Sequence, residues 1–505
     1  MKKLAHLLVK KPFSVTVLIL LQLVSVYLAV FTLSQRFAFI YTMQYFLDLI
    51  VVIYILNRPD NPSYKLTWTI FILGVPVIGL ITYLMFGGRK VPKALRLGIN
   101  ELVKGPKPLL SQDERVLEKI RRAVDRRSAT YLLNNTGFPI FDATKVRYYA
   151  SGESKFEALL SAIEQAKSFI FLEYFILKEG VVWTTLFELL KRKVNEGVEV
   201  RLMIDDAGAG TLPHDFVDQV KAAGIQIAIF NPIRPVLAIR MNNRDHRKIA
   251  VVDGKIGFIG GLNIADEYVN IQSRFGHWKD VAISLEGDAV YSLTLMFLQF
   301  FDYTTRTQSD FLHYKAKHKA FENEGLVQAF SDSPTDDEAV SENAHLNLIN
   351  TASHSLYIMT PYLVIGYEMV SALCTAAKSG VDVRIIVPGI PDKKYVFTVT
   401  RSNYEILTKN GVRIYEYTPG FMHGKVMIAD DKMAIVGTSN QDFRSYYLHF
   451  ECGALIMDSP ALSDIALDFK ETFAKSREIS YAETLQVSAL VKVYRAIMNV
   501  FAALF

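Results

Sequence analysis

The stretch "RDHRKIAVVDGKIGFIGGLN" (residues 244–263) is the most informative about the fold, because its pattern recurs in "FMHGKVMIADDKMAIVGTSN" (residues 421–440). Both stretches carry His, Lys, Asp, Gly and Asn at identical spacings. The two sets are His246, Lys248, Asp253, Gly260 and Asn263, and His423, Lys425, Asp430, Gly437 and Asn440. One such match arises by chance about one time in 20. Five matches at fixed offsets therefore indicate an internal duplication.

The segments around the two motifs also repeat, in the same order along the chain. "GVEVRLMIDDAG" (residues 197–208) resembles "GVDVRIIVPGIP" (residues 380–391), and "AAGIQIAIFNP" (residues 222–232) resembles "KNGVRIYEYTP" (residues 409–419). Apolar runs that alternate with helix-like stretches are typical of βα units. The sequence therefore predicts an α/β fold built from two homologous repeats, each with its own His-Lys strand.

The expected organisation adds an apolar N-terminus, polar connecting segments and an apolar tail to these repeats. We expect, in order, a membrane-spanning region of two or three helices (1–90), a polar linker (91–135), the first repeat (136–305), an acidic linker (306–343), the second repeat (344–480) and a C-terminal helix (481–505). The end of the tail is apolar apart from Lys492, Arg495 and Asn499. This pattern suits either a helix packed on the second repeat or an interfacial membrane helix.

The membrane-spanning region is expected because three apolar blocks, at 13–33, 37–56 and 66–86, open the chain. Each has roughly the 20 residues that a helix needs to cross a bilayer. Lys and Arg residues lie at both ends of the region, which favours an even number of spans. Three blocks conflict with that rule, so the side of the membrane that the catalytic part faces stays open.

Composition argues against several classes of function. The net charge of +5 over 505 residues is small for a nucleic-acid-binding protein, so we expect no nucleic-acid partner. The two cysteines, Cys374 and Cys452, form no CxxC pair, which argues against a zinc site or a disulfide framework.

Each motif places a histidine and a lysine on one side of an extended segment, because residues two apart in a strand face the same way. His246 therefore projects with Lys248, and His423 with Lys425. This set suits displacement at a phosphodiester, in which one histidine attacks phosphorus, the other protonates the leaving alkoxide, and the lysines hold the phosphate oxygens. Neither motif carries a cluster of carboxylates, so we expect no metal and no other cofactor.

The turn that follows each histidine predicts what the histidine faces. Asp253-Gly254 is a two-residue hairpin signal. A turn of that length would place His246 opposite Gly261, and the same count places His423 opposite Thr438. These small residues would leave room for a substrate phosphate.

The remaining motif residues divide into two groups. Asn263, Asn440 and Thr438 lie at the strand ends and are expected to bind the phosphate. Asp253 and Asp430 belong to the motif and so to the expected catalytic set, but their place in the turns favours a structural role.

The paired H-x-K-x4-D motif followed by G-x-x-N resembles that of the phospholipase D superfamily. Closer features resemble bacterial cardiolipin synthases over nearly the whole chain: "GLITYLMFGGRK", "EYFI", "NNRDHRKI", "GGLNIADEY", "TPY", "NQDFRS" and "HFE". Two departures are Thr438, where that family often has Ser, and His449, where Asn is usual. The resemblance implies two phospholipase D-like repeats with the active site at their interface, in a multi-pass protein of the bacterial cell membrane.

The resemblance also implies an activity. Such enzymes join two phosphatidylglycerol molecules into cardiolipin and free glycerol at the membrane, without nucleotide or metal. By this resemblance His246 would form a phosphatidyl-histidine, and His423 would act as acid and then as base. Asp280 and Glu451 match the carboxylates that orient the two imidazoles in the family.

Other readings stay open. A membrane phospholipase D would use water as acceptor, and a phosphatidylserine synthase would use serine. A nuclease shares the motif, but the apolar N-terminus and the small net charge count against it. A membrane scaffold with a vestigial site is the alternative outside enzymes, and two intact motifs argue against it. The oligomeric state stays open too.

Six charged residues near the motifs have two readings each. The arginines either meet anionic headgroups or form a solvated loop, and the aspartates either serve the site or cap a helix. They are Arg234, Arg240, Arg244, Arg247, Asp205 and Asp206.

Overall fold

The computed structural model gives the positions of most of the chain. It describes residues 38–87, 109–232, 242–318 and 321–504 apart from Asn323 and Asp337, together with Val24, Tyr27, Leu28, Val91, Arg96, Gly98 and Ile99.

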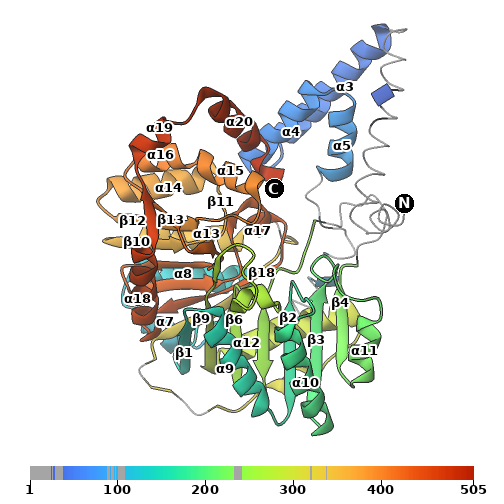
Figure 1. Cartoon of the computed structure of the whole chain (residues 1–505), viewed down its shortest axis with the longest axis vertical. Coiled ribbons are helices and arrows are strands. Elements are labelled where there is room, and N and C mark those ends of the chain that lie inside the picture. The colour runs from blue at the N-terminus through green and yellow to red at the C-terminus, as the bar shows by residue number, and fades with distance from the viewer. Residues whose placement is uncertain are drawn as a thin grey trace.

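Two mixed β-sheets form the centre of the protein, one in each repeat (Figure 1). The strands of the first repeat are β1 (Thr144–Tyr149), β2 (Phe169–Tyr174), β3 (Glu199–Asp205), β4 (Gln226–Phe230), β5 (Ile249–Val252), β6 (Ile256–Gly260), β7 (His277–Lys279) and β8 (Ala282–Gly287). Those of the second are β9 (Leu326–Asp332), β10 (Ser355–Met359), β11 (Leu363–Val364), β12 (Asp382–Pro388), β13 (Arg413–Tyr417), β14 (Gly420–Met422), β15 (Val426–Ala429), β16 (Met433–Gly437), β17 (Gln441–Asp442), β18 (Glu451–Met457) and β19 (Ser476–Ile479).

The two sheets have the same topology. The first runs β1-β8-β6-β5-β2-β3-β4, and the second, read from the matching edge, runs β9-β18-β16-β15-β10-β12-β13-β19. Position by position the orders agree, and β19 is an addition at one edge. The prediction of an α/β protein with two homologous repeats is therefore confirmed.

Helices cover the sheets and join the repeats. The first repeat contains α9 (Gly152–Glu164), α10 (Val181–Asn195), α11 (Phe216–Ala222), α12 (Val290–Thr305) and the short helices η3 (Asp266–Val269) and η4 (Phe311–Tyr314). The second contains α13 (Val340–Thr351), α14 (Tyr367–Lys378), α15 (Lys394–Ser402), α16 (Tyr404–Lys409), α17 (Phe443–Tyr447) and α18 (Ala461–Ala474).

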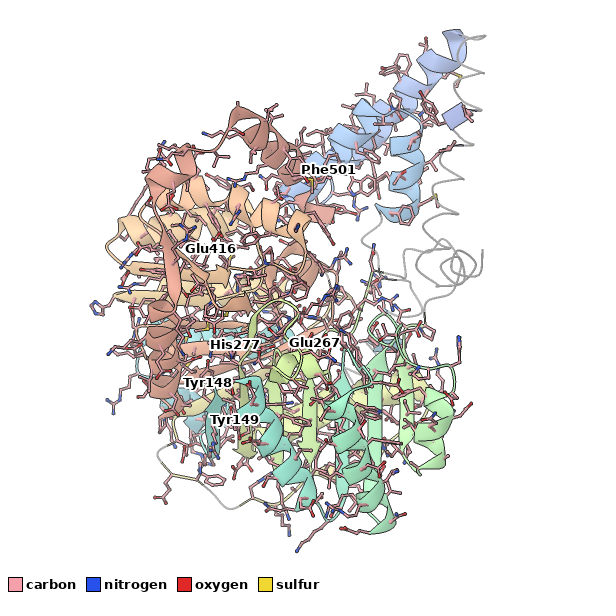
Figure 2. The ribbon with its side chains drawn as sticks, viewed as in Figure 1. Tyr148, Tyr149, Glu267, His277, Glu416 and Phe501 are labelled. Carbon is pink, nitrogen blue, oxygen red and sulfur yellow. The ribbon has the colours of Figure 1, made fainter. Side chains whose placement is uncertain are left out.

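Helix α12 shows where the main core lies. It is apolar on nearly every side, and 13 of its 16 residues are buried, as expected of a helix enclosed by protein. Phe297 stacks on Phe171 of β2, while Phe300 packs at 4.8 Å between ring centroids against Phe450 of the second repeat. One apolar core therefore extends from the first sheet into the second repeat. In Figure 2, Glu267 and His277 lie at the level where the two repeats meet.

The register of the two hairpins differs from the prediction by one residue. Val252 pairs with Ile256 and Ala429 with Met433, so each turn leaves three residues outside the ladder. Asp253 and the residue after it have positive φ, as the predicted turn requires, but the next residue, Lys255, stays unpaired in the ladder. The predicted pairings of the histidines with Gly261 and Thr438 are therefore wrong.

In the part of the N-terminus that the structure describes, the expected transmembrane helices are not found. The described region has α3 (Ala38–Leu56), α4 (Pro62–Gly74) and α5 (Ile78–Phe86). The block at 66–86 is divided at Pro76, which cannot continue a hydrogen-bonded helix, so α4 and α5 have only 13 and 9 residues. Within the described residues, no helix combines the length and apolarity needed to cross a bilayer, which corrects the prediction. The block at 13–33 falls almost wholly outside those residues.

Both segments expected as linkers contribute to the second repeat. Residues 91–135 include α7 (Glu114–Glu118) and most of α8 (Ala123–Thr136), whose Ala129 and Leu132 are buried in its core. Residues 306–343 include β9, the edge strand that matches β1. This strand is hard to recognise in the sequence because the polar residue Gln328 interrupts its apolar pattern. In the structure Gln328 is buried, and its amide donates to the carbonyl oxygen of Ala129 at 3.2 Å.

The C-terminal tail folds into α19 (Tyr481–Leu485), α20 (Ala489–Val500) and η5 (Ala502–Leu504). Helix α20 packs beside α15 and α4, and Phe501 lies close to α4 (Figure 2), with its ring 6.3 Å from that of Phe71. The outer face of α20 is apolar and exposed, and Leu490 has 84% of its surface accessible.

Candidate active site

The two motif histidines lie just before β5 and β15, in extended segments that have left their own sheets. The backbone N–H of His246 donates to the carbonyl oxygen of Phe450 at 3.0 Å, and that of His423 donates to the carbonyl oxygen of Lys279 at 2.7 Å. Each histidine is therefore held against a segment of the other repeat. This contact brings the two motifs together at the interface between the repeats.

Each histidine also meets a carboxylate from the other repeat. Nδ1 of His246 lies 2.9 Å from Oε1 of Glu451 at the start of β18, and Nδ1 of His423 lies 2.6 Å from Oδ2 of Asp280, just before β8. Both carboxylates have no accessible surface. Nζ of Lys425 also lies 2.9 Å from Nδ1 of His423, but the 2.6 Å contact with Asp280 is shorter and takes the Nδ1 proton. Each carboxylate accepts a hydrogen bond from Nδ1, so Nε2 of each imidazole keeps its lone pair. That is the form needed for attack on phosphorus or for taking a proton.

Burial sets the charge of these groups. It lowers the pKa of His246 well below its ordinary value in spite of Glu451, and it lowers the pKa of His423 to about 4, with Lys425 adding to the effect. Burial alone would raise the pKa of Glu451, but His246 and its other neighbours hold that pKa well below the ordinary value. In the empty site at neutral pH, a neutral imidazole therefore faces a carboxylate ion.

The two lysines lie beside the histidines, as the spacing predicts. Nζ of Lys425 donates to the carbonyl oxygen of His423 at 2.6 Å, and Lys248 makes the same contact with His246. Both are buried, and among the residues that the structure describes no carboxylate lies within ion-pair distance of either ammonium. Burial lowers the pKa of Lys248 to about 8 and that of Lys425 to about 7. Their charge is available to a phosphate group.

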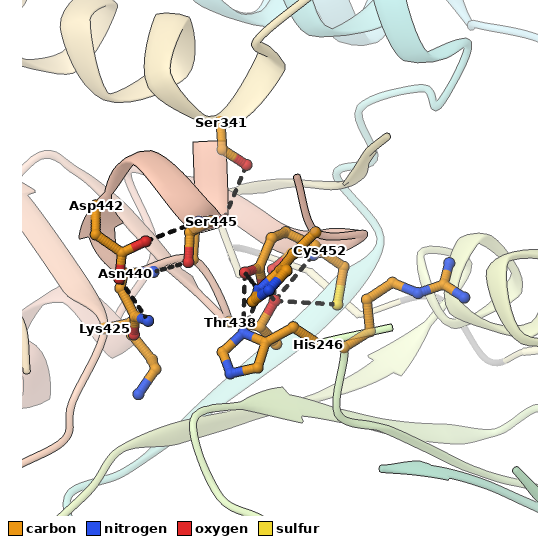
Figure 3. Close-up of polar contacts among 12 residues, drawn as sticks. His246, Ser341, Lys425, Thr438, Asn440, Asp442, Ser445 and Cys452 are labelled. Atoms are coloured by element: carbon orange, nitrogen blue, oxygen red, sulfur yellow. Dashed lines mark hydrogen bonds and ion pairs between the residues drawn. The ribbon is translucent and has the colours of Figure 1, made fainter. Parts of the chain in front are cut away.

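The three expected phosphate ligands make contacts with protein groups. Oγ1 of Thr438 donates to Oε2 of Glu451 at 2.5 Å. Oγ1 of Thr438 also accepts from the N–H of Cys452 at 3.0 Å, and Figure 3 shows these two residues side by side. Oδ1 of Asn263 accepts from the N–H of Ile176 at 2.9 Å, and its Nδ2 donates to the Tyr268 hydroxyl. Nδ2 of Asn440 donates to its neighbour Asp442, while Oδ1 is buried without a hydrogen bond among the described residues. Thr438 therefore fixes the carboxylate behind His246.

Asp253 and Asp430 are not brought to the histidines. Asp253 accepts three backbone N–H groups, from residues 167–169 at the start of β2. Asp430 accepts the equivalent three, from residues 353–355 at the start of β10. Both therefore tie the turn end of their hairpin to the neighbouring strand.

The ambiguous charged residues mostly hold the segment that carries His246. Arg247 is buried and paired with Glu173 at 2.6 Å and with Asp245 at 3.0 Å. Asp205 pairs with Arg244 at 3.3 Å and accepts from the N–H of Asp245 at 2.9 Å. Arg234 and Arg240 lie outside the described residues.

Sequence reasoning missed the aromatic surroundings of the histidines. Tyr268, Trp278 and Phe421 surround His423, with ring centroids 5.0 to 5.6 Å away. The rings of Phe175 and His449 lie 5.1 and 5.4 Å from that of His246. The signal was present for Trp278, which stands two residues before Asp280, as His449, already noted as a departure from the family, stands two residues before Glu451.

The lysine pKa values predict how activity depends on pH. An ammonium whose pKa is lowered to about 7 or 8 is charged below that pH and neutral above it. We expect kcat/KM, which reports the free enzyme, to fall as pH rises through these two values. In Lys425→Met the limb near pH 7 should disappear and the limb near pH 8 should remain. A kcat/KM that stays level or rises across this range would contradict the assignment.

The chain matches a known family in both repeats. The family described as "Cardiolipin synthase, PLD-like domain" matches residues 159–273 and 345–475. A second, described as "Phospholipase_D-nuclease N-terminal", matches residues 46–88.

Curated relatives cover most of the chain. The cardiolipin synthase of a Geobacillus strain is 35% identical over 445 residues, which are 86% of this chain and 87% of the relative. Cardiolipin synthase 2 of Bacillus anthracis is 36% identical and covers 85% and 84% of the two chains. A Streptococcus mutans protein described as uncharacterized is 43% identical and covers 86% and 95%.

Among solved structures, phosphatidylserine synthase from Haemophilus influenzae superposes with a TM-score of 0.59 at 14% identity. The match covers 76% of this chain and 100% of that one. At that identity the likeness shows a shared fold.

Proposed function

Because this chain belongs to the family of cardiolipin synthases with phospholipase D-like domains, as its motifs indicated, we propose that it transfers a phosphatidyl group between two phosphatidylglycerol molecules. The products are cardiolipin and glycerol. The observation that carries the proposal is the pair of buried imidazoles at the interface, each with Nδ1 on a carboxylate and Nε2 left for chemistry.

In the first half-reaction, Nε2 of His246 attacks phosphorus and the bond to the glycerol oxygen breaks. The proton that this oxygen needs comes from Nε2 of His423. His423 must be protonated for this step. Burial disfavours the protonated imidazole when no substrate is bound, but the negative charge of a bound phosphodiester favours it.

In the second half-reaction, His423 removes the proton from a hydroxyl of the second phosphatidylglycerol. The resulting oxygen attacks phosphorus, the P–N bond breaks, and His246 returns to its starting state. Lys248 and Lys425 hold the non-bridging oxygens, where charge develops in both transition states.

Product analysis tests the proposal. Purified protein is incubated with vesicles of phosphatidylglycerol as the sole lipid, and the lipids are quantified by mass spectrometry. We expect cardiolipin and an equal amount of glycerol. Phosphatidic acid as the main product would mean that water is the acceptor, and phosphatidylserine formed on adding serine would identify a different transferase.

The same proposal places the protein at a membrane surface, because both substrates are lipids. The exposed apolar face of α20 supports this, and α20 contacts α4, which also exposes apolar side chains. On α20 the residues are Leu490, Val491, Val493, Tyr494 and Ile497. Lys492 and Arg495 of the same helix face the protein instead, where Lys492 lies 3.7 Å from Glu405 and Arg495 donates to the carbonyl oxygen of Arg401.

Charged substitutions on α20 should weaken membrane binding. We expect Leu490→Asp/Val493→Asp to lower binding to phosphatidylglycerol vesicles by about 10-fold or more, because two apolar contacts are lost and two negative charges added. Co-sedimentation measures this. The control, Leu312→Asp/Leu467→Asp, changes two other leucines that each have more than half of their surface accessible. An equal loss in both proteins would show that net charge, and not α20, determines binding.

A further inference from the structure

A third ionisable group lies behind His246 and has no part in the proposed reaction. His449 is 8% exposed, and its Nδ1 lies 3.8 Å from Oε1 of Glu451, too far for a hydrogen bond. The N–H of His449 donates to the carbonyl oxygen of Arg444 at 3.0 Å, which fixes its backbone. Oε1 of Glu451 therefore lies between two histidines: it is hydrogen-bonded to His246 and not to His449.

These three side chains have the spacing of a metal site. One ligand atom from each of His246, His449 and Glu451 lies within 4.8 Å of the other two. Around a tetrahedral zinc ion, ligand atoms stand about 3.4 Å apart. The observed separations of Glu451 Oε1 from the two Nδ1 atoms, 2.9 and 3.8 Å, lie on either side of that value. Small rotations of the rings would bring both into range.

A contact outside these three side chains favours metal binding. Thr438 holds Oε2 of Glu451, which directs Oε1 to the two imidazoles, and outer contacts of this kind raise metal affinity. Two nitrogens and one carboxylate oxygen are ligands that Zn²⁺ takes, with water in the fourth position. Mg²⁺ prefers oxygen ligands and would bind poorly.

We propose that His246, His449 and Glu451 form an inhibitory binding site for Zn²⁺. The ion binds Nδ1 of His246, and the proton that Nδ1 carried moves to Nε2, so the imidazole stays neutral. Nε2 thereby loses the lone pair that attacks phosphorus. Zinc binding itself does not depend on the proposed function. The inhibitory effect of zinc rests on that function.

The first repeat supplies an internal comparison. Trp278 stands two residues before Asp280, where His449 stands two residues before Glu451. An indole offers no metal ligand. The site therefore exists in one half of the active site, and the expected stoichiometry is one ion per chain.

Calorimetric titration of the EDTA-stripped, full-length protein with ZnCl₂ measures the binding. We expect one site in the wild type and at least about 10-fold weaker binding in His449→Phe and in His449→Asn. The matched control is His354→Phe, which removes an exposed histidine far from the site and should bind as the wild type does. Co²⁺ should give the visible absorption bands of a tetrahedral ion, and MgCl₂ should give no heat of binding.

Transfer activity is measured in parallel, as a fraction of each protein's own metal-free rate. Zinc should inhibit the wild type in step with occupancy, and both His449 variants should need at least about 10-fold more zinc for the same effect. Absence of a one-to-one site, or unchanged affinity in both variants, would overturn the proposal. Binding without inhibition would overturn its inhibitory part. A protein that binds zinc but makes no cardiolipin would refute the proposed function and leave the metal site standing.

Discussion

His246→Ala and His423→Ala are each expected to reduce cardiolipin synthesis by at least about 10³-fold, the largest loss from any single substitution. Alanine at position 246 removes the atom that bonds to phosphorus. Alanine at position 423 removes the proton donor for the departing glycerol oxygen. The two roles cannot replace one another, because each imidazole is fixed by its own carboxylate. Conversion of phosphatidylglycerol, followed by mass spectrometry, measures the loss.

A substrate with a better leaving group distinguishes the two roles. Phosphatidyl-p-nitrophenol releases a stable phenolate that needs little help from an acid. His423→Ala should therefore recover an initial burst of nitrophenol, about one per active site, and His246→Ala should give none. A burst in His246→Ala but not in His423→Ala would mean that the roles are exchanged. Near-normal cardiolipin synthesis by either variant would refute the two-histidine mechanism.

Lys248→Met and Lys425→Met are expected to lower kcat/KM on the order of 100-fold each. Methionine keeps the length of the side chain but removes the charge that meets the phosphate oxygens. Because the lysines stabilise charge that grows in the transition state, kcat should fall as well as substrate binding. Lys193→Met is the matched control, because Lys193 on α10 is equally buried but pairs with Glu196. It should leave kcat close to the wild-type value.

Thermal unfolding separates this loss from damage to the fold. Burial lowers the pKa of both motif lysines, so their ammonium groups are destabilised in the folded protein without substrate. Methionine at either position should keep or raise the melting temperature. Lost activity together with a lowered melting temperature would point to misfolding instead.

The sequence was most informative where residue type and spacing both recur. The repeated His-x-Lys pattern predicted two repeats with matching strand order, and the placement of each lysine beside its histidine followed from a period of two. Asp253 and Asp430 could be assigned to turns because Asp253-Gly254 is a hairpin signal and Asp430-Asp431 is a weaker one. The carboxylates Asp280 and Glu451 came from resemblance alone, since nothing local marks their contacts with the opposite repeat.

The failures have physical causes that a linear pattern does not contain. The hairpin register moved by one because Lys255 lies outside the ladder, although the turn residues have the predicted positive φ. Strand β9 was hidden by Gln328, whose buried Nε2 donates to a carbonyl oxygen of α8, a helix nearly 200 residues earlier in the chain. The block at 66–86 was interpreted as one apolar span, but the chain is divided at Pro76 into two shorter helices.

The exchange of carboxylates between the repeats has a consequence for how such a site can change over time. In a symmetric dimer of identical chains, every substitution appears twice, so both imidazoles must stay alike. Here both halves belong to one polypeptide, and a mutation near Glu451 leaves Asp280 untouched. The two halves have already diverged, with an aspartate and a tryptophan behind one histidine and a glutamate and a histidine behind the other. Fusion thus frees one imidazole to be tuned for bonding to phosphorus and the other for moving protons, a division of labour that identical subunits cannot reach.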